Sequence, residues 1–126
     1  MNLVTNVAID FTAPAVLSNG EIIEDFCLSK HVNGKYAVLF FYPLDFTFVC
    51  PTEIISFSNK INDFSRLGTE VIGVSVDSKF SHHRWRQIPV SNGGIGEVSY
   101  PLVSDIKKSI SRDYGVLYDD AVALRG

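Results

Sequence analysis

The strongest pattern along the chain is an unbroken apolar and aromatic run, seven residues long, from Tyr36 to Tyr42. Such a run is typical of a strand that is covered on both faces, so it predicts a central strand of a sheet. Pro43 ends this strand because proline has no N–H for a strand ladder. Apolar residues then recur at steps of three and four, which predicts one long helix of roughly four to five turns. These residues are Ile54, Phe57, Ile61, Phe64 and Leu67.

Shorter segments before and after this unit alternate between strand and helix patterns. Valine and isoleucine in the run 69–77 predict a second buried strand, and Ser78 is a suitable cap for a helix that ends before Pro89. Asp105 is a suitable cap for a later helix that starts at Ile106. This alternation predicts an α/β protein with a mixed sheet. The other predicted elements are a strand at 21–26, a helical turn at 28–32, a strand at 100–103 and the approach to a strand at 121–125.

Composition limits the classes of function. A chain of 126 residues predicts a single domain, residues 1–126, and its net charge of −3 without a basic stripe argues against nucleic-acid binding. No apolar run approaches the roughly 18 residues of a membrane span, and the first residues resemble neither a signal peptide nor a transit peptide. The 2 cysteines do not make a disulfide framework, so we expect a reducing compartment, the cytoplasm. Because the last segment points into a strand and stops, we expect a fragment or a chain truncated at its C-terminus.

Cys50 lies where the long helix is predicted to begin, directly before Pro51, which suits the first helical turn. The start of a helix offers unpaired N–H groups and partial positive charge, and both favour a thiolate over a thiol. Such cysteines titrate below the free value of about 8.5. The alternative is a buried structural cysteine, which is common among cysteines in general. The flanking polar residues favour the reactive reading; they are Asp45, Thr47, Thr52 and Glu53.

The segment Pro43-Leu44-Asp45-Phe46-Thr47-Phe48-Val49-Cys50 resembles the peroxidatic motif of the peroxiredoxins, Pro-x-x-x-Thr-x-x-Cys. More closely, it is similar to the typical two-cysteine subfamily, which includes bacterial alkyl hydroperoxide reductase. The resemblance implies a thioredoxin-like fold, with a mixed sheet flanked by helices, and a thiol-dependent peroxidase without a bound cofactor. Further matches extend along the chain: VIGVSVDS at 71–78, His82 with Trp85, GGIG at 93–96, PLVSD at 101–105, DYGVL at 113–117 and LRG at 124–126.

The resemblance assigns a role to each residue that matches the motif. Cys50 is expected to be the peroxidatic cysteine, which hydroperoxide oxidises to a sulfenic acid. Thr47 is expected to hold the peroxide and the thiolate, and Arg125 to pair with the thiolate and the reacting oxygens. Pro43 is expected to shield the pocket from water, and Glu53 to orient the arginine. Simpler readings remain for Thr47 as a loop cap, for Glu53 as a favourable acid in a first helical turn and for Arg125 as a surface charge.

The chain departs from the family in lacking the downstream Val-Cys-Pro segment that carries the resolving cysteine. The other thiol, Cys27, matches no family motif, and we expect it to be a buried small residue. Loss of the later strands and helix is expected to expose apolar surface and a strand edge and to disrupt the usual dimer. For full-length members the resemblance implies a dimer or decamer and reduction by thioredoxin or a flavoprotein disulfide reductase.

The sequence is also compatible with other functions, to different degrees. A holdase-like or assembly protein remains open because the family also forms rings that shield unfolded clients. A thioredoxin-like disulfide oxidoreductase would need Cys-x-x-Cys, but Thr47 stands three residues before Cys50. A metal site at His82 and His83 is disfavoured, since adjacent helical residues do not face one another.

Overall fold

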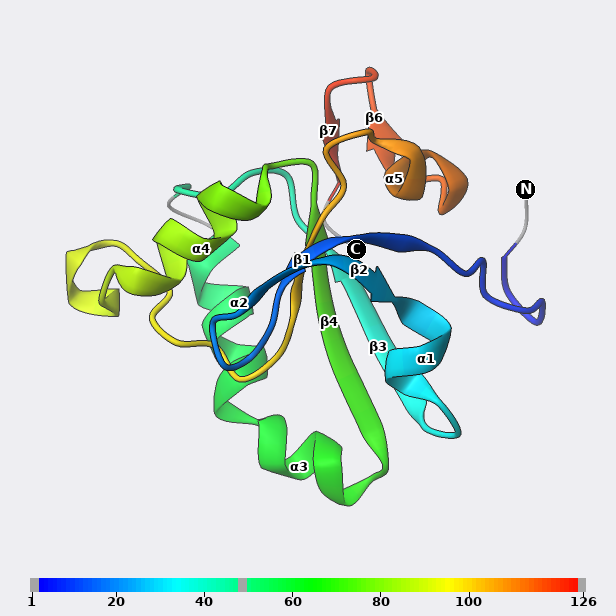
Figure 1. Ribbon diagram of the computed structural model, residues 1–126, viewed down its shortest axis with the longest axis horizontal. Coiled ribbons are helices and arrows are strands. Elements are labelled where there is room, and N and C mark those ends of the chain that lie inside the picture. The colour runs from blue at the N-terminus through cyan, green and yellow to red at the C-terminus, as the bar shows by residue number, and fades with distance from the viewer. Residues whose placement is uncertain (1–2, 48–49, 125–126) are drawn as a thin grey trace.

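The computed structural model describes residues 3–47 and 50–124. A five-stranded sheet lies in the middle of the molecule (Figure 1). The strand order is β2-β1-β5-β4-β3, and β6 and β7 form a separate two-stranded hairpin. The strands are β1 Thr12–Val16, β2 Ile22–Cys27, β3 Tyr36–Phe41, β4 Thr69–Ser75, β5 Leu102–Ser104, β6 Leu117–Tyr118 and β7 Val122–Ala123. The helices are α1 Leu28–Val32, α2 Cys50–Asn59, α3 Ile61–Arg66, α4 Lys79–Gln87, the 3-10 turn η1 Val90–Asn92 and α5 Ser109–Asp113.

The sheet is mixed. Strands β3, β4 and β5 run parallel to one another, whereas β1 is antiparallel to both of its neighbours, β2 and β5. The parallel pair β3 and β4 requires a crossover, which α2 and α3 supply. The carboxyl ends of β3, β4 and β5 therefore meet at one edge of the sheet, where ligands of open α/β sheets usually bind.

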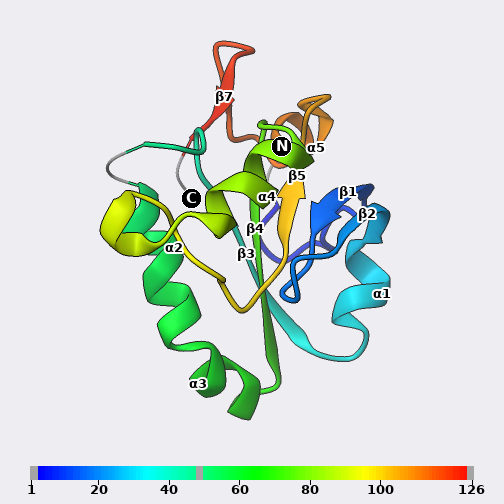
Figure 2. The same cartoon turned by 60° about the vertical axis from the view of Figure 1, so that its left-hand side comes forward.

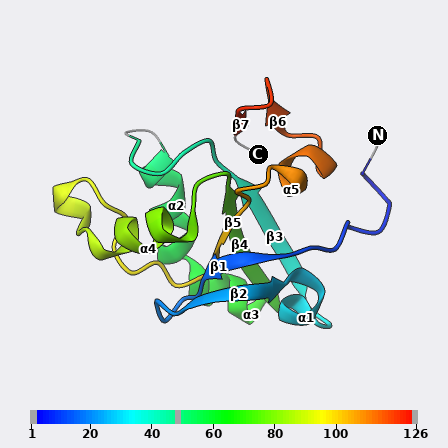
Figure 3. The ribbon, with the colours of Figure 1, turned by 45° about the horizontal axis from the view of Figure 1, so that its top comes forward.

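Helices cover the sheet on both faces, so the chain has three layers (Figure 2). On one face α2, α3 and α4 enclose a core that includes Ile54 and Trp85, both 0% exposed. On the other face α1 and α5 pack over a second core that includes Ile72 and Val74. The β6–β7 hairpin stands beside α5 (Figure 3) and contributes Ala123 to the second core. These layers confirm the predicted mixed sheet flanked by helices.

The position of β3 differs from its prediction. The strand forms at Tyr36–Phe41, but it lies at the edge of the sheet, because β4 is its only partner among residues 3–47 and 50–124. Its first half is open, with Tyr36 75% exposed, whereas Phe40 and Phe41 at its carboxyl end are buried. An apolar run indicates a strand, but it does not reveal how many neighbours that strand has.

The predicted long helix is wrong in one respect, since it is divided at Lys60 into α2 and α3. Lys60 leaves helical geometry with φ −105° and ψ 13°, and its N–H bonds to Phe57 O, three residues back. Asn59 and Lys60 are exposed, and asparagine is a weak helix former. A break there leaves Phe57 and Phe64 packed against the same core, so the apolar spacing does not reveal it.

The two predicted helix caps have different outcomes. Ser78 caps α4 as predicted, and its hydroxyl accepts a hydrogen bond from Ser81 N at 3.1 Å. The helix after Asp105 begins at Ser109 rather than Ile106, because Lys108 takes a left-handed conformation with φ 63°. The Asp105 carboxylate nevertheless accepts from the first turns of α5, from Ile110 N at 3.1 Å and from Ser111 N at 2.7 Å.

Candidate active site

The loop that joins β3 to α2 carries two of the residues expected to form the site, Pro43 and Thr47. Pro43 is half-buried directly after β3. Phe46 has φ 59°, a left-handed conformation that is uncommon for a residue with a side chain. The Thr47 hydroxyl donates to Leu44 O at 3.3 Å and closes a turn around this step. Thr47 thus has the loop-bending contact that its simpler reading requires, while its oxygen lone pairs can accept a hydrogen bond from a ligand.

Cys50 is the first residue of α2, so the predicted placement at a helix start is confirmed for its backbone. Its side chain lies outside the described residues, as do Phe48 and Val49. Glu53 is exposed in the first turn of the same helix. Arg125 also lies outside the described residues, so its role at the site stays a prediction. Pro43 and Thr47 therefore lie in the loop that leads to α2, and Cys50 and Glu53 lie in the first turn of that helix.

A buried hydrogen-bonded cluster lies next to this loop, and the sequence patterns do not predict it. His82 Nδ1 lies 2.6 Å from Asp45 Oδ2, and the Tyr42 hydroxyl donates to Asp45 Oδ1 at 2.8 Å. The other ring nitrogen of His82, Nε2, lies 3.0 Å from the main-chain oxygen of Val103 in β5. The main-chain N–H of Asp45 donates to Asp77 Oδ2 at 2.5 Å. The cluster thus joins the loop to all three parallel strands at their carboxyl ends.

Burial shapes the titration of two members of this cluster. Burial, and after it the negative charge of Asp45, raises the pKa of Tyr42 well above its ordinary value. The phenol therefore keeps its hydrogen and acts as a donor. Burial also raises the pKa of Asp77, although the hydrogen bond from Asp45 N–H opposes that rise.

Trp85 packs in the core beside the site. Its side chain is 0% exposed and lies against Phe46, with ring centroids 5.8 Å apart. The indole N–H donates to Gly93 O at 3.4 Å, which ties α4 to the glycine-rich loop. Phe46 itself is 51% exposed, so it forms part of the surface beside the site.

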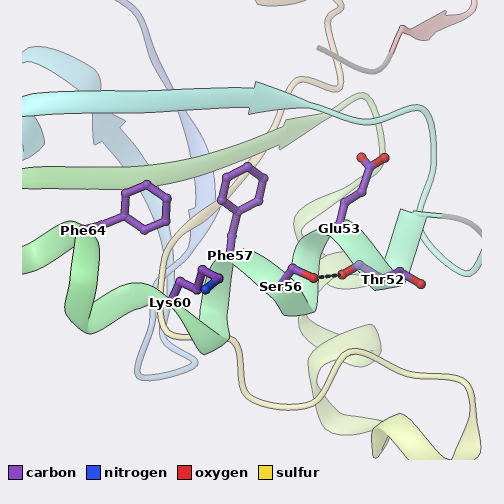
Figure 4. Close-up of a pocket in the computed structure, with 6 residues that line it drawn as sticks. All are labelled: Thr52, Glu53, Ser56, Phe57, Lys60 and Phe64. Carbon is purple, nitrogen blue, oxygen red and sulfur yellow. Dashed lines mark hydrogen bonds between the residues drawn. The ribbon is translucent and has the colours of Figure 1, made fainter.

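An open apolar cavity of about 360 Å³ lies along α2 and α3 (Figure 4). The rings of Phe57 and Phe64 form its apolar wall, and Lys60 lies between them at the break of the two helices. At the other end, near the start of α2, Ser56 donates to Thr52 O at 2.8 Å. The polar groups of this cavity do not converge, so it indicates no specific ligand.

Cys27 was expected to be a buried small residue, but it is half-buried. Its Sγ lies 3.3 Å from Ser29 Oγ and 3.8 Å from Asp10 Oδ2. The hydrogen bond with Ser29 lowers the pKa of Cys27. The prediction failed because the apolar Leu28 beside it in sequence points into the core, while the thiol faces the polar N-terminal segment.

Within the described part of the chain, no group of three or more His, Cys, Asp and Glu residues could hold a metal ion. Both ring nitrogens of His82 face protein oxygens, one of Asp45 and one of Val103. No helix of residues 3–47 and 50–124 has the length and apolar character needed to cross a membrane.

Comparison with known proteins identifies the family. The model of the AhpC/TSA family matches residues 4–126. The chain belongs to this family. It is 58% identical over 124 residues to alkyl hydroperoxide reductase C of Helicobacter pylori, covering 98% of this chain and 63% of that protein. It is 55% identical over 125 residues to the chloroplastic 2-Cys peroxiredoxin BAS1 of Spinacia oleracea, covering 98% of this chain and 46% of that protein.

A solved structure agrees with this assignment. The reduced 2-Cys peroxiredoxin of Plasmodium vivax superposes with a TM-score of 0.93 at 46% identity, over 98% of this chain and 76% of that one. The resemblance to peroxiredoxins and the thioredoxin-like fold are therefore confirmed. The chain spans about half to two thirds of the length of these two curated AhpC/TSA relatives.

Proposed function

We propose that the chain is a thiol-dependent peroxidase that reduces hydrogen peroxide and organic hydroperoxides through Cys50. The observation that carries the proposal is the position of Cys50 as the first residue of α2, in a chain that matches the AhpC/TSA family over residues 4–126. The Cys50 thiolate attacks one peroxide oxygen, the O–O bond breaks, and the other oxygen leaves as water or an alcohol after it takes up a proton. Cys50 is left as a sulfenic acid, and the peroxide has been reduced by two electrons.

A lowered thiol pKa alone does not account for fast peroxide reduction. Lowering the pKa by about two units from 8.5 raises the thiolate fraction at pH 7 roughly 25-fold. Nucleophilicity falls about six- to ten-fold at the same time, if the slope for thiol–disulfide exchange applies. The net gain is only a few-fold, so hydrogen-bond donors aimed at the breaking O–O bond must provide most of the acceleration.

The residues proposed to hold the peroxide and to stabilise the reacting oxygens follow from the loop and the family motif. The Thr47 hydroxyl accepts a hydrogen bond from the peroxide, since its own hydrogen is directed at Leu44 O in the described chain. Arg125 supplies N–H donors to the reacting oxygens and a positive charge beside the thiolate. Glu53 orients Arg125 from the first turn of α2, and the half-buried ring of Pro43 limits the access of water.

The reductant and the assembly belong to the same proposal. We infer that thioredoxin or a flavoprotein disulfide reductase returns oxidised Cys50 to the thiol in the cytoplasm, and that full-length forms assemble as dimers or decamers. These inferences rest on the likeness to alkyl hydroperoxide reductase C and to 2-Cys peroxiredoxins. By itself, the chain should consume one equivalent of peroxide and stop unless an external thiol resolves the sulfenic acid.

Stopped-flow mixing with hydrogen peroxide, followed by mass spectrometry, tests the function. The expected result is a single-turnover burst that places one oxygen on Cys50. Cys50→Ser should abolish the burst, and the matched variant Cys27→Ser should retain it. Oxygen found mainly on Cys27, or a burst that survives Cys50→Ser, would remove the basis of the proposal. Sustained cycling without an added thiol would contradict the expected stop after one turnover.

A further inference from the structure

His82 is placed so that both ring nitrogens face oxygen atoms. Val103 O, which lies 3.0 Å from Nε2, can only accept a hydrogen bond, so Nε2 carries a hydrogen. At 2.6 Å, Nδ1 and Asp45 Oδ2 cannot both present lone pairs to each other, so a hydrogen also lies between them. Both side chains are 0% exposed. The pair therefore holds two hydrogens on or between its polar atoms, at Nε2 and between Nδ1 and Oδ2.

This arrangement balances charge inside the protein. With both hydrogens present the pair is neutral overall, as an imidazolium beside a carboxylate or as an imidazole beside a carboxylic acid. Removal of the hydrogen between the two side chains would leave a buried negative charge without compensation, which is strongly unfavourable. The other titratable groups that face the pair are Tyr42, which donates to Asp45 Oδ1, and Asp77, which accepts from Asp45 N. Neither of these groups can supply a compensating positive charge.

The pair fixes the middle of the loop that leads to Cys50. Asp45 is held through its carboxylate by Tyr42 and His82 and through its N–H by Asp77. The next residue, Phe46, adopts its left-handed conformation, and the Thr47 hydroxyl then closes the turn onto Leu44 O. A left-handed conformation at a residue other than glycine persists only when its surroundings enforce it. On the N-terminal side of Phe46, the hydrogen bonds of Asp45 hold the backbone in this conformation.

We propose that the buried Asp45–His82 pair is a positioning device for the site, which sets the path of the loop and thereby places Thr47 relative to Cys50 at the start of α2. This inference rests on the proposed peroxidase function only for its effect on peroxide, because the placement of Cys50 can be measured without peroxide. His82 acts through Asp45 and the loop.

Two variants test the pair in a Cys27→Ser background, so that Cys50 is the single thiol. Asp45→Asn keeps the shape of the side chain but removes its charge. His82→Gln removes the imidazole ring, whose two nitrogens contact Asp45 and Val103 on opposite sides. Each should slow oxidation of Cys50 by hydrogen peroxide about tenfold or more, because misplacement by about 1 Å costs that much. Each should also shift the pH midpoint of Cys50 alkylation by iodoacetamide upward, toward the free-thiol value of about 8.5.

Phe26→Leu is the matched control, since Phe26 is 3% exposed in the core on the other face of the sheet. It should lower the melting temperature without changing either Cys50 measurement. The double variant Asp45→Asn/His82→Gln should be no slower than the slower single variant, because the two side chains act as one unit. If the single variants leave the oxidation rate and the alkylation midpoint unchanged, or if Phe26→Leu changes them equally, the pair does not position the loop and the proposal is wrong.

Nitrogen-15 NMR of the unmodified chain supplies a test that does not depend on the folding of any variant. The His82 ring should show a hydrogen on Nε2 and a strongly downfield hydrogen between Nδ1 and Asp45. A ring without a hydrogen on Nε2 would overturn the proposal. If peroxide fails to oxidise Cys50 in the parent chain, the proposed function fails, while the alkylation midpoints and the NMR signals still decide whether the pair positions the loop.

Discussion

The phenol of Tyr100 donates a 2.6 Å hydrogen bond to the main-chain oxygen of Ile54, which ties the segment before β5 to the second turn of α2. Tyr100 is 1% exposed and Ile54 is 0% exposed. Burial raises the pKa of Tyr100, so the phenol keeps its hydrogen and remains a donor at neutral pH. The helix that begins with Cys50 is thus fixed to the sheet by a specific polar contact as well as by its apolar side.

Tyr100→Phe should destabilise the chain by about 1–2 kcal/mol, because it removes a hydrogen bond to a buried carbonyl oxygen without changing the ring. Urea unfolding followed by circular dichroism measures the difference. Tyr118→Phe is the control, since Tyr118 is 61% exposed and should change stability little. Equal stability of Tyr100→Phe and the parent chain would show that this hydrogen bond makes no net contribution to the free energy of unfolding.

Gly73→Ala should destabilise the chain by about 1–3 kcal/mol through overpacking in the core. An added Cβ at Gly73 would lie 2.8 Å from Phe40 Cζ and 3.0 Å from Leu102 Cδ2. The same unfolding measurement applies. Phe40→Leu in the same chain should recover part of the loss, because it removes the nearer atom. Additive losses in the double variant would mean that Phe40 is not the obstacle.

Asp10 should make stability depend on pH in the acid range. Hydrogen bonds from the Ser29 hydroxyl and N–H lower the pKa of Asp10. A carboxyl whose pKa is lower in the folded state stabilises the fold above its unfolded value of about 3.9, and this contribution is lost as the pH falls through the folded value. The parent chain should therefore melt higher than Asp10→Asn at pH 6, and the gap should shrink below about pH 4. Thermal melts across pH measure it, and a gap that does not change with pH would be inconsistent with this account.

Ser29 should control the reactivity of Cys27. Its hydroxyl lies 3.3 Å from Cys27 Sγ, and a hydrogen bond from it to the thiolate, made in place of the one to Asp10 Oδ2, is the main cause of the lowered pKa of that thiol. In a Cys50→Ser background, Ser29→Ala should slow alkylation of Cys27 at pH 7 by about two-fold or more, since less thiolate is present. Iodoacetamide kinetics read by mass spectrometry give the rate. Faster alkylation would indicate that Ser29 mainly shields the thiol.

Arg125→Met should reduce the rate of peroxide reduction by more than the loss of thiolate explains. Removal of a positive charge beside Cys50 changes both the thiolate fraction and the nucleophilicity of the thiolate, and together these change the rate of peroxide reduction by only a few-fold. Loss of a hydrogen-bond donor to the reacting oxygens lowers that rate by about a hundred-fold or more. Pre-steady-state peroxide kinetics, compared with the alkylation rate of Cys50, separate the two effects. A peroxide rate within a few-fold of the parent chain would contradict the proposed role of Arg125.

Local patterns predicted local structure. The strand at Tyr36–Phe41 and the cap at Ser78 each depend on neighbours within a few residues, and both are present. The break at Lys60 escaped detection because Phe57, Ile61 and Phe64 keep helical spacing across it. The edge position of β3 depends on strand partners that are remote in sequence.

The same distinction applies to the site. The motif around Cys50 is contiguous, so the resemblance to peroxiredoxins could be recognised from the sequence. Asp45 and His82 are 37 residues apart, and no spacing rule relates a loop carboxylate to a helical histidine at that separation. In the sequence, Asp45 stands out as a polar neighbour of Cys50 within the motif segment, and His82 as part of a family match and of a disfavoured metal pair, and neither observation links the two residues.

The edge position of β3 should affect how copies of this chain associate in concentrated solution. Among residues 3–47 and 50–124, no strand pairs with the outer side of β3, and Tyr36 and Ala37 at its start are exposed. Main-chain groups in such a row are a template on which a further strand can form. Association through this row would lengthen the sheet from one molecule into the next and would tolerate most changes of side chain.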